Sequence, residues 1–121
     1  MSKPKILLCE DELNYRQLIK NFLIKNGYDV HLAVDGLEAI EKVKNIQPDI
    51  IILDIRMPKI DGIEVAEQIR KFDKKIKIIF LTAFQSPQLS QEAEKYNISA
   101  YITKPTSLEQ ILDTIKESLA L

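Results

Sequence analysis

Apolar and polar residues follow one another along the chain in blocks. Three uninterrupted apolar runs lie at residues 6–9, 50–53 and 78–81. Each run has the length of a β-strand, and a strand without polar alternation is typically covered on both faces of its sheet. Such strands are usually parallel. Two further strands, of less uniform composition, are predicted at Asp29–Ala33 and Ala100–Thr103.

Amphipathic segments separate the predicted strands. The two longest place apolar side chains at i, i+3, i+4, i+7 and similar spacings, as a helix with one buried face does. Their apolar positions are Tyr15, Leu18, Ile19, Phe22 and Leu23 in the first segment, and Leu108, Ile111, Leu112, Ile115 and Leu119 in the last. Gly27 is predicted to end the first of these helices.

Two shorter helices are predicted in the middle of the chain. The stretch "DGLEAIEKVKN" gives a helix with Leu37, Ile40 and Val43 turned inward. Another helix is expected over residues 62–72, where Gly62 follows a turn containing Pro58. Each of these helices lies between two predicted strands, as the crossover helix of a parallel strand pair does.

The stretch "SPQLSQEAEKYN" predicts one more helix. Its apolar face consists only of Leu89, Ala93 and Tyr96, so we expect this helix to dock weakly. Strand and helix then alternate five times, which is typical of an α/β domain with an open parallel sheet, helices on both faces and right-handed crossovers. The 121 residues suit one domain, which we expect to span residues 1–121.

Composition excludes several classes of function. The 17 basic and 18 acidic side chains leave a formal net charge of −1, which provides no general attraction to nucleic acid or to an anionic membrane. Cys9 is the single cysteine, so no internal disulfide forms, and its apolar neighbours predict a buried, inert thiol. The chain start lacks a signal peptide and no apolar run reaches the roughly 20 residues of a membrane span, so we expect a cytoplasmic protein.

Polar side chains follow four of the five predicted strands at their carboxyl ends. They are Glu10 with Asp11, Asp54, Thr82 and Lys104. Ligands of open α/β sheets bind at this edge. Any one of these residues alone is equally well explained as a solvated loop residue or as a helix N-cap, as for Asp11. All of them together predict a functional site.

Three carboxylates at one edge require a compensating positive charge. At about 4 Å, each pair repels by several kcal/mol at an effective dielectric near 20. Lys104 supplies one charge and a divalent cation supplies two. Hard oxygen ligands suit Mg²⁺ or Mn²⁺, and the chain has no His or Cys cluster that favours zinc.

Asp54 is the candidate reactive group. A carboxylate at the end of a buried strand is held rigidly and still faces the open edge of the sheet, where it can act as a nucleophile toward phosphorus. Thr82 is placed to donate its hydroxyl to a phosphoryl oxygen, and Lys104 to pair with another.

The motifs together resemble those of the receiver domains of two-component response regulators. The matching stretches are "CED" at 9–11, "LDIRMPKIDG" at 53–62, "LTAF" at 81–84 and "TKPT" at 103–106, in order and over essentially the whole chain. The resemblance implies a flavodoxin-like (βα)5 fold with strand order 2-1-3-4-5. It further implies that Asp54 accepts a phosphoryl group from a phosphohistidine of a histidine kinase or phosphotransferase, in a Mg²⁺-dependent reaction that the domain itself promotes, as it does dephosphorylation.

The same resemblance assigns roles to other residues. Glu10, Asp11, Asp54 and the backbone carbonyl of Arg56 are expected around the metal ion. Thr82 and Tyr101 are expected to form the conformational switch, and Lys104 to bind the phosphoryl group.

Some positions vary within the family or depart from its usual pattern. Glu10 replaces the commoner aspartate and Thr106 replaces a frequent phenylalanine, which puts a partner contact through that ring in doubt. Arg56 and Phe84 flank the expected path of an attacking water. The Lys104–Pro105 bond is often cis in the family, whereas the sequence alone favours trans.

The expected output is a conformational change in the fourth helix, the last strand and the last helix. The donor is expected to dock on the first helix, where Asn14, Gln17 and Lys20 form an outer face. We also expect a downstream protein target, no direct contact with nucleic acid or membrane, and a monomer or a phosphorylation-dependent dimer. A free-standing regulator, similar to chemotaxis or sporulation-relay regulators, is favoured over a fragment of a larger one.

Three alternatives share part of this arrangement. A haloacid-dehalogenase-type phosphohydrolase needs a second acid two residues after its nucleophile, where this chain has Arg56. A flavodoxin-like electron carrier needs a phosphate-binding loop after the first strand, where this chain is acidic. A receiver-like interaction module that is never phosphorylated usually lacks an acid, the threonine or the lysine, and this chain has all of them.

Overall fold

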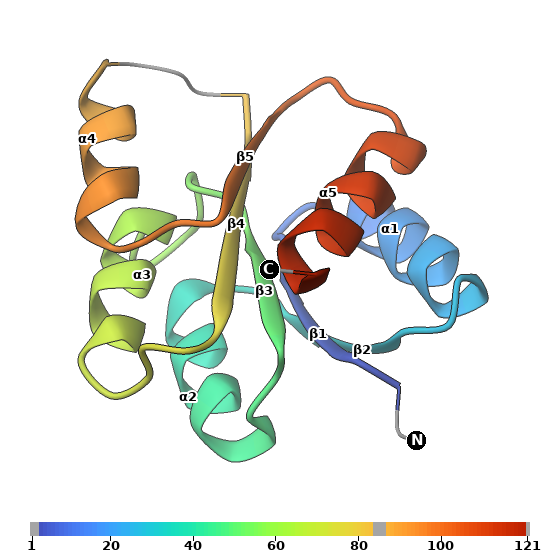
Figure 1. The fold of residues 1–121 in the computed structure, drawn as a ribbon, viewed down its shortest axis with the longest axis horizontal. Coiled ribbons are helices and arrows are strands. Elements are labelled where there is room, and N and C mark those ends of the chain that lie inside the picture. Colours follow the sequence, from blue (N-terminus) through green and yellow to red (C-terminus); the bar gives the residue numbers. More distant parts are fainter. Residues whose placement is uncertain (1–2, 84–86, 121) are drawn as a thin grey trace.

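The computed structural model describes residues 3–83 and 87–120. Its centre is a five-stranded sheet in which all neighbouring strands are parallel and the order is β2-β1-β3-β4-β5 (Figure 1). The strands are β1 (Lys5–Cys9), β2 (Asp29–Ala33), β3 (Ile50–Leu53), β4 (Lys77–Thr82) and β5 (Ala100–Thr103). The predicted α/β fold, the flavodoxin-like strand order and the strand positions are confirmed, with β1 and β4 longer than predicted by one and two residues.

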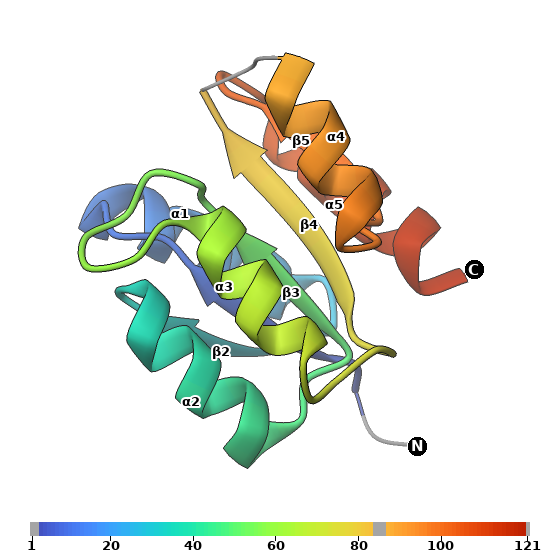
Figure 2. The ribbon, with the colours of Figure 1, turned by 90° about the vertical axis from the view of Figure 1, so that its left-hand side faces the viewer.

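Helices cover both faces of the sheet. They are α1 (Leu13–Lys25), α2 (Gly36–Ile46), α3 (Gly62–Arg70), α4 (Pro87–Lys95) and α5 (Leu108–Ala120). Figures 1 and 2 show α1 and α5 on one face and α2, α3 and α4 on the other. No helix within residues 3–83 and 87–120 has both the length and the apolar character to cross a membrane.

Two hydrophobic cores, one on each face, explain the unbroken apolar runs. In β3, Ile50 and Ile52 join the core beneath α1 and α5, while Ile51 and Leu53 join the core beneath α2 and α3. Successive side chains of a strand point to opposite faces, so a strand with a core on each side is apolar at every position.

Acidic and hydroxyl side chains fix the starts of four helices. The Glu12 carboxylate accepts from the backbone N–H groups of Asn14 and Tyr15 at 3.1 and 2.6 Å, and so caps α1. The other caps are Asp35 for α2, Asp61 for α3 and Ser107 for α5. The alternative that Asp11 is an N-cap is wrong, because Glu12 takes that place.

Two leucines predicted to face inward are exposed. Leu18 and Leu37 each keep 52% of their surface accessible. In α1 the inner stripe contains Arg16, Ile19 and Leu23, and Leu18 lies outside it. In α2 the inner stripe contains Gly36 because the helix packs closely there: a Cβ at Gly36 would lie 2.5 Å from a side-chain carbon of Ile60.

The helices α3 and α4 differ in how firmly they are held. The α3 helix ends at Arg70 rather than Phe72, and the ring of Phe72 is partly exposed beneath the Lys44 ammonium, 5.0 Å from the ring centroid. Of the α4 side chains that the structure describes, only Leu89 is buried. Tyr96 lies just beyond α4, and its hydroxyl donates to Glu67 of α3 at 3.0 Å. The side chain of Ala93, the remaining residue of the predicted face, lies outside the described part.

Candidate functional site

The carboxyl ends of four strands bring the predicted polar residues to one edge of the sheet. Glu10 follows β1, Asp54 follows β3, Thr82 ends β4 and Lys104 follows β5. Glu10, Asp54 and Thr82 are buried, with 1%, 8% and 2% of their surface accessible. Such low exposure means that protein groups or a bound ligand must satisfy their polar atoms.

Lys104 bridges two of the acids. Its Nζ lies 2.8 Å from Oε1 of Glu10 and 2.8 Å from Oδ2 of Asp54. Burial disfavours the charged lysine, but the hydrogen bonds to Asp54 and Glu10 raise the pKa of Lys104 above its ordinary value. Burial also raises the pKa of Glu10, against the effect of the Lys104 hydrogen bond. The Tyr15 ring, with its centroid 5.1 Å from Nζ, adds a cation–π contact.

Backbone amides hold the remaining oxygen of each buried acid. The N–H of Arg56 donates to Oδ1 of Asp54 at 3.1 Å, and the N–H of Glu12 donates to Oε2 of Glu10 at 3.1 Å. Both carboxylates are therefore fixed in orientation by their own loops.

Asp11 differs from the two buried acids because it is exposed. One oxygen of each of Glu10, Asp11 and Asp54 lies within 4.8 Å of the others. Among the described residues, no donor is hydrogen-bonded to the Asp11 carboxylate. This set of hard oxygen donors, with one carboxylate open to solvent, fits a divalent cation such as Mg²⁺.

Arg16 supports the acidic segment, residues 10–12, and this role was not predicted from the sequence. Its guanidinium, on the inner side of α1, donates to the carbonyls of Glu10 at 2.9 Å and Asp11 at 3.3 Å. The available signal was its spacing: Arg16 precedes Ile19 by three residues and Leu23 by seven, so a cation stands in the buried stripe of the helix.

The loop between β3 and α3 packs tightly against the carboxyl end of β3. The N–H of Gly62 donates to the carbonyl of Ile55 at 2.8 Å, and a Cβ at Gly62 would lie only 2.7 Å from the carbonyl oxygen of Asp54. Lys59 adopts a φ of 74° in this loop, and its ammonium lies 3.1 Å from the Asp35 carboxylate. The loop is thus joined to both the strand and the start of α2.

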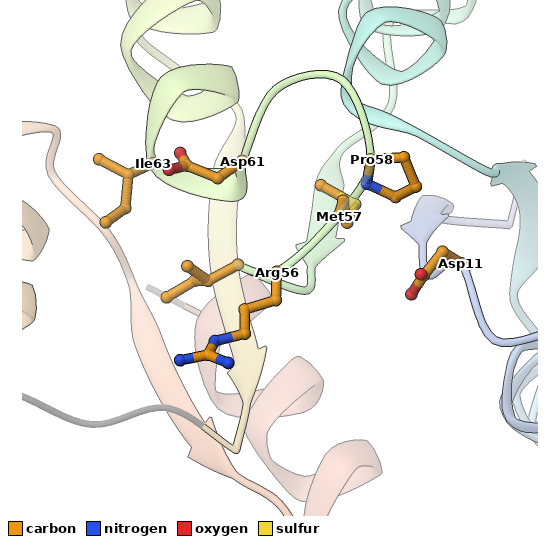
Figure 3. Close-up of a pocket in the computed structure, with 7 residues that line it drawn as sticks. Asp11, Arg56, Met57, Pro58, Asp61 and Ile63 are labelled. Carbon is orange, nitrogen blue, oxygen red and sulfur yellow. The ribbon is translucent and has the colours of Figure 1, made fainter.

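A hollow of about 540 Å³ opens between this loop and the acidic segment. Figure 3 shows Asp11 on one side of it, facing Arg56, Met57 and Pro58 across the open space. Asp61 and Ile63 line the far end. The hollow gives an incoming group access to the edge of the sheet where the acids gather.

The predicted switch residues lie beside this edge. The carbonyl of Thr82 accepts from the N–H of Lys104 at 2.9 Å, which joins the ends of β4 and β5. Tyr101 is half-buried and meets Phe80 edge-on, with centroids 5.9 Å apart and an interplanar angle of 66°. The Lys104–Pro105 peptide bond is cis. Phe84 lies outside the described residues.

Comparisons with known proteins agree with this geometry. The family model described as "Response regulator receiver domain" matches residues 6–116. Sporulation initiation phosphotransferase F of Bacillus subtilis (strain 168) is 31% identical over 121 residues, covering 100% of this chain and 98% of that protein. Chemotaxis protein CheY of the same organism is 33% identical over 116 residues, covering 95% of this chain and 97% of that protein. The chain spans about half the length of the mycobacterial response regulators MprA that it also matches.

Solved structures show the same fold. A CheY-like response regulator receiver domain protein from Methanospirillum hungatei JF-1 has a TM-score of 0.95 at 29% identity, covering 98% of this chain and 95% of that one. These matches do not favour a hydrolase or a silent interaction module. They indicate a signalling regulator rather than an enzyme. The chain belongs to the response regulator receiver domain family, and it is a phosphoacceptor of two-component signalling.

Proposed function

We propose that Asp54 is the phosphoacceptor, and that a phosphohistidine of a histidine kinase or phosphotransferase is the donor. One Asp54 carboxylate oxygen forms a bond to phosphorus, the phosphorus–nitrogen bond of the donor breaks, and its electron pair returns to the histidine ring. The observation that carries this proposal is the position of Asp54: it ends the central strand β3, 2.8 Å from the Lys104 ammonium and within the acidic cluster. A nucleophile in a fixed orientation beside a fixed cation suits phosphoryl transfer.

We assign the metal site to Glu10, Asp11, Asp54 and the backbone carbonyl of Arg56, with Mg²⁺ or Mn²⁺ as the ion. A bound divalent cation neutralises charge on the transferring phosphoryl oxygens. Both oxygens of Glu10 already accept hydrogen bonds, whereas Asp11 is exposed, which favours Asp11 as the direct ligand. Glu10 then serves mainly to hold Lys104.

Lys104 and Thr82 bind the phosphoryl group after transfer. Phosphorylation replaces one carboxylate charge with roughly two negative charges and three acceptor oxygens. Lys104, already paired with Asp54, is placed to follow that charge, and the Thr82 hydroxyl donates to a second oxygen. By lowering the barrier in this way, the domain promotes both its own phosphorylation and its dephosphorylation.

The conformational change that follows phosphorylation is a repacking of the sheet edge around β4, β5 and α4. Movement of Thr82 toward the phosphoryl group frees space beneath Tyr101, which turns further inward. The weakly held α4 shifts with it, because Leu89 is its one buried side chain among those described. The changed surface, which includes α5, contacts a downstream protein, while the donor docks on α1. The receiver domain comprises residues 1–121.

Intact mass spectrometry tests the acceptor. Wild type, Asp54→Asn and Asp113→Asn are incubated with acetyl phosphate, with and without Mg²⁺. Asp113 is an exposed acid of α5, so its variant matches the loss of one charge. We expect a single Mg²⁺-dependent phosphoryl adduct on wild type and Asp113→Asn and none on Asp54→Asn. An adduct that persists in Asp54→Asn contradicts the proposal.

Backbone NMR tests the switch separately. Upon phosphorylation, the amides from Thr82 to Tyr101 should shift, while those of α2 should not. Spectra in which Asp54 is fully phosphorylated and the amides from Thr82 to Tyr101 keep their positions would refute the repacking and leave the acceptor assignment intact.

A further inference from the structure

A second hollow lies at the opposite edge of the sheet. It has a volume of about 510 Å³ and lies between the end of α3, the turn that leads into β4, and the segment after α4. In Figure 1 this turn lies at the lower end of β4, from which the strand runs up to the edge that holds the acidic cluster. The phosphoacceptor mechanism uses none of the residues around this hollow.

The hollow is strongly basic. Among the described residues, no acidic side chain lines it. Four of the residues that line it are cations, namely Arg70, Lys74, Lys75 and Lys77. Within the described ranges, no carboxylate oxygen lies within 4.0 Å of these four cations. The local charge of the hollow is therefore opposite in sign to the formal net charge of the chain, which is −1.

Asp73, the nearest acid in sequence, is turned away into its own loop. Its Oδ1 accepts from the N–H groups of Lys75 at 2.9 Å and Ile76 at 3.0 Å. The carboxylate therefore stabilises the turn that presents the two exposed lysines, and it does not neutralise them.

Arg70 forms a fixed cation on the inner side of the hollow. Its guanidinium donates to three carbonyls, from Nε to Tyr96 at 2.7 Å, from Nη1 to Asp73 at 3.1 Å and from Nη2 to Asn97 at 3.1 Å. Carbonyl dipoles orient the group without removing its charge. Burial lowers the pKa of Arg70, which Asp73 opposes, so an anion beside it would relieve a desolvated cation. A guanidinium has five N–H donors, and two of them stay available for a ligand.

We propose that this hollow binds a small anion with two adjacent phosphate groups, such as pyrophosphate or the phosphate chain of a nucleotide. The volume lies in the range of small-molecule sites. Lysines bind phosphate as point charges and arginine binds it through its fork, and both types are present. The side chains of Asn97 and Ser99, which also line the hollow, offer further hydrogen bonds.

The position of Arg70 favours a small ligand over an acidic protein surface. Lys74 and Lys75 are exposed and accessible to either, but Arg70 is only half-exposed and lies inside a concave site. A small anion can enter the hollow and meet Arg70 there, whereas a broad surface contacts the rim.

The test is a calorimetric titration at near-physiological salt in Mg²⁺-free buffer. The probes are inorganic phosphate, pyrophosphate, ADP, ATP and a hexaglutamate peptide. The proteins are wild type, Lys74→Gln/Lys75→Gln and the control Lys25→Gln/Lys116→Gln, which also removes two exposed lysines. We expect saturable binding of pyrophosphate, tighter than that of phosphate, about tenfold weaker in the Lys74/Lys75 variant and unchanged in the control. Tighter binding of ADP than of pyrophosphate identifies a nucleotide as the source of the phosphates, and equal binding identifies the phosphate chain alone.

Three calorimetric outcomes would overturn the proposal. They are no saturable binding, equal weakening in both variants, or hexaglutamate binding as tightly as pyrophosphate. NMR with pyrophosphate locates the site: shifts must cluster at residues 70–77 and 97–99, and shifts confined to Glu10 and Asp54 refute it. Asp54 phosphorylation should be normal in Lys74→Gln/Lys75→Gln, so the two proposals succeed or fail independently.

Discussion

Replacing Asp54 with asparagine should make the protein more stable when no divalent cation is present. The side chain is 8% exposed and belongs to a cluster of three acids with one ammonium. Asparagine keeps nearly the same shape, and its carbonyl oxygen still accepts from the Arg56 amide. The substitution therefore removes a charge with little change in packing.

The magnitude follows from the distances. Asp54 lies 2.8 Å from Lys104, which corresponds to an attraction of about 6 kcal/mol at an effective dielectric near 20. Its distance to an oxygen of each other acid is at most 4.8 Å, which at the same dielectric gives a repulsion of at least about 3.5 kcal/mol from each, or at least about 7 kcal/mol together. Lys104 keeps Glu10 as its partner, and the burial penalty of one carboxylate disappears. Water around exposed Asp11 weakens its share, so we expect a net gain of about 1–3 kcal/mol.

Urea unfolding followed by circular dichroism measures this difference. In EDTA, Asp54→Asn should unfold at higher urea than wild type, and Asp113→Asn should differ by less than about 0.5 kcal/mol. Saturating Mg²⁺ should stabilise wild type, by about 2.7 kcal/mol at a hundred times the dissociation constant, and the variant much less. If Asp54→Asn is less stable than wild type in EDTA, the Lys104 attraction outweighs the repulsion and the reasoning fails.

Three further substitutions probe other parts of the structure. Gly62→Ala should lower the free energy of unfolding by about 1–3 kcal/mol, measured in urea, because the new methyl group meets the Asp54 carbonyl. Asp35→Ala should cost about 0.5–2 kcal/mol near neutral pH through loss of the α2 cap. The hydrogen bond from the Glu38 amide is the main cause of the lowered pKa of Asp35. The difference in stability between Asp35→Ala and wild type should therefore persist above the ordinary pKa of an aspartate and vanish as the pH falls through the lowered pKa. Thermal unfolding at a series of pH values measures this difference. Tyr96→Phe should lower the urea midpoint of unfolding slightly and speed hydrogen exchange in α4, because a hydrogen bond to α3 is lost.

Much of the fold was predictable because the apolar pattern reports burial directly. A strand with a core on both sides, such as Ile50–Leu53, must be apolar throughout, and β3 was placed to the residue. Helix faces were predicted less well, since periodicity identifies apolar positions and not the distance of approach. Leu37 is exposed because the buried face of α2 is that of Gly36, Ala39 and Val43, with close packing at Gly36, and Leu37 lies outside this face. Strand order came from the family resemblance, which the alternation alone does not supply.

The sequence predicted which residues form the site and at which edge of the sheet they lie, but it did not predict their hydrogen bonds. Parallel strands end at one edge, so acids after β1 and β3 had to meet. The bridging of two acids by Lys104, and the support of the acidic segment by Arg16, depend on side-chain distances that no spacing rule gives. The basic hollow was missed because its four cations, although they lie within residues 70–77, form a concave site only together with the segment after α4, whose carbonyls hold Arg70.

The contact between Gly62 and the acceptor strand has an evolutionary consequence. The Gly62 amide closes the loop onto Ile55, so residues 56–61 form a ring with a narrow neck. Side chains within the ring line the hollow beside Asp11. The neck, the pairing of Asp54 with β1 and the Arg56 amide together set the position of Asp54. Selection can therefore alter the ring to suit a new donor without moving the acceptor. The choice of donor can therefore change through the side chains of residues 57–61 while Arg56 and the neck keep Asp54 in place, a property that suits a domain reused in many signalling pathways.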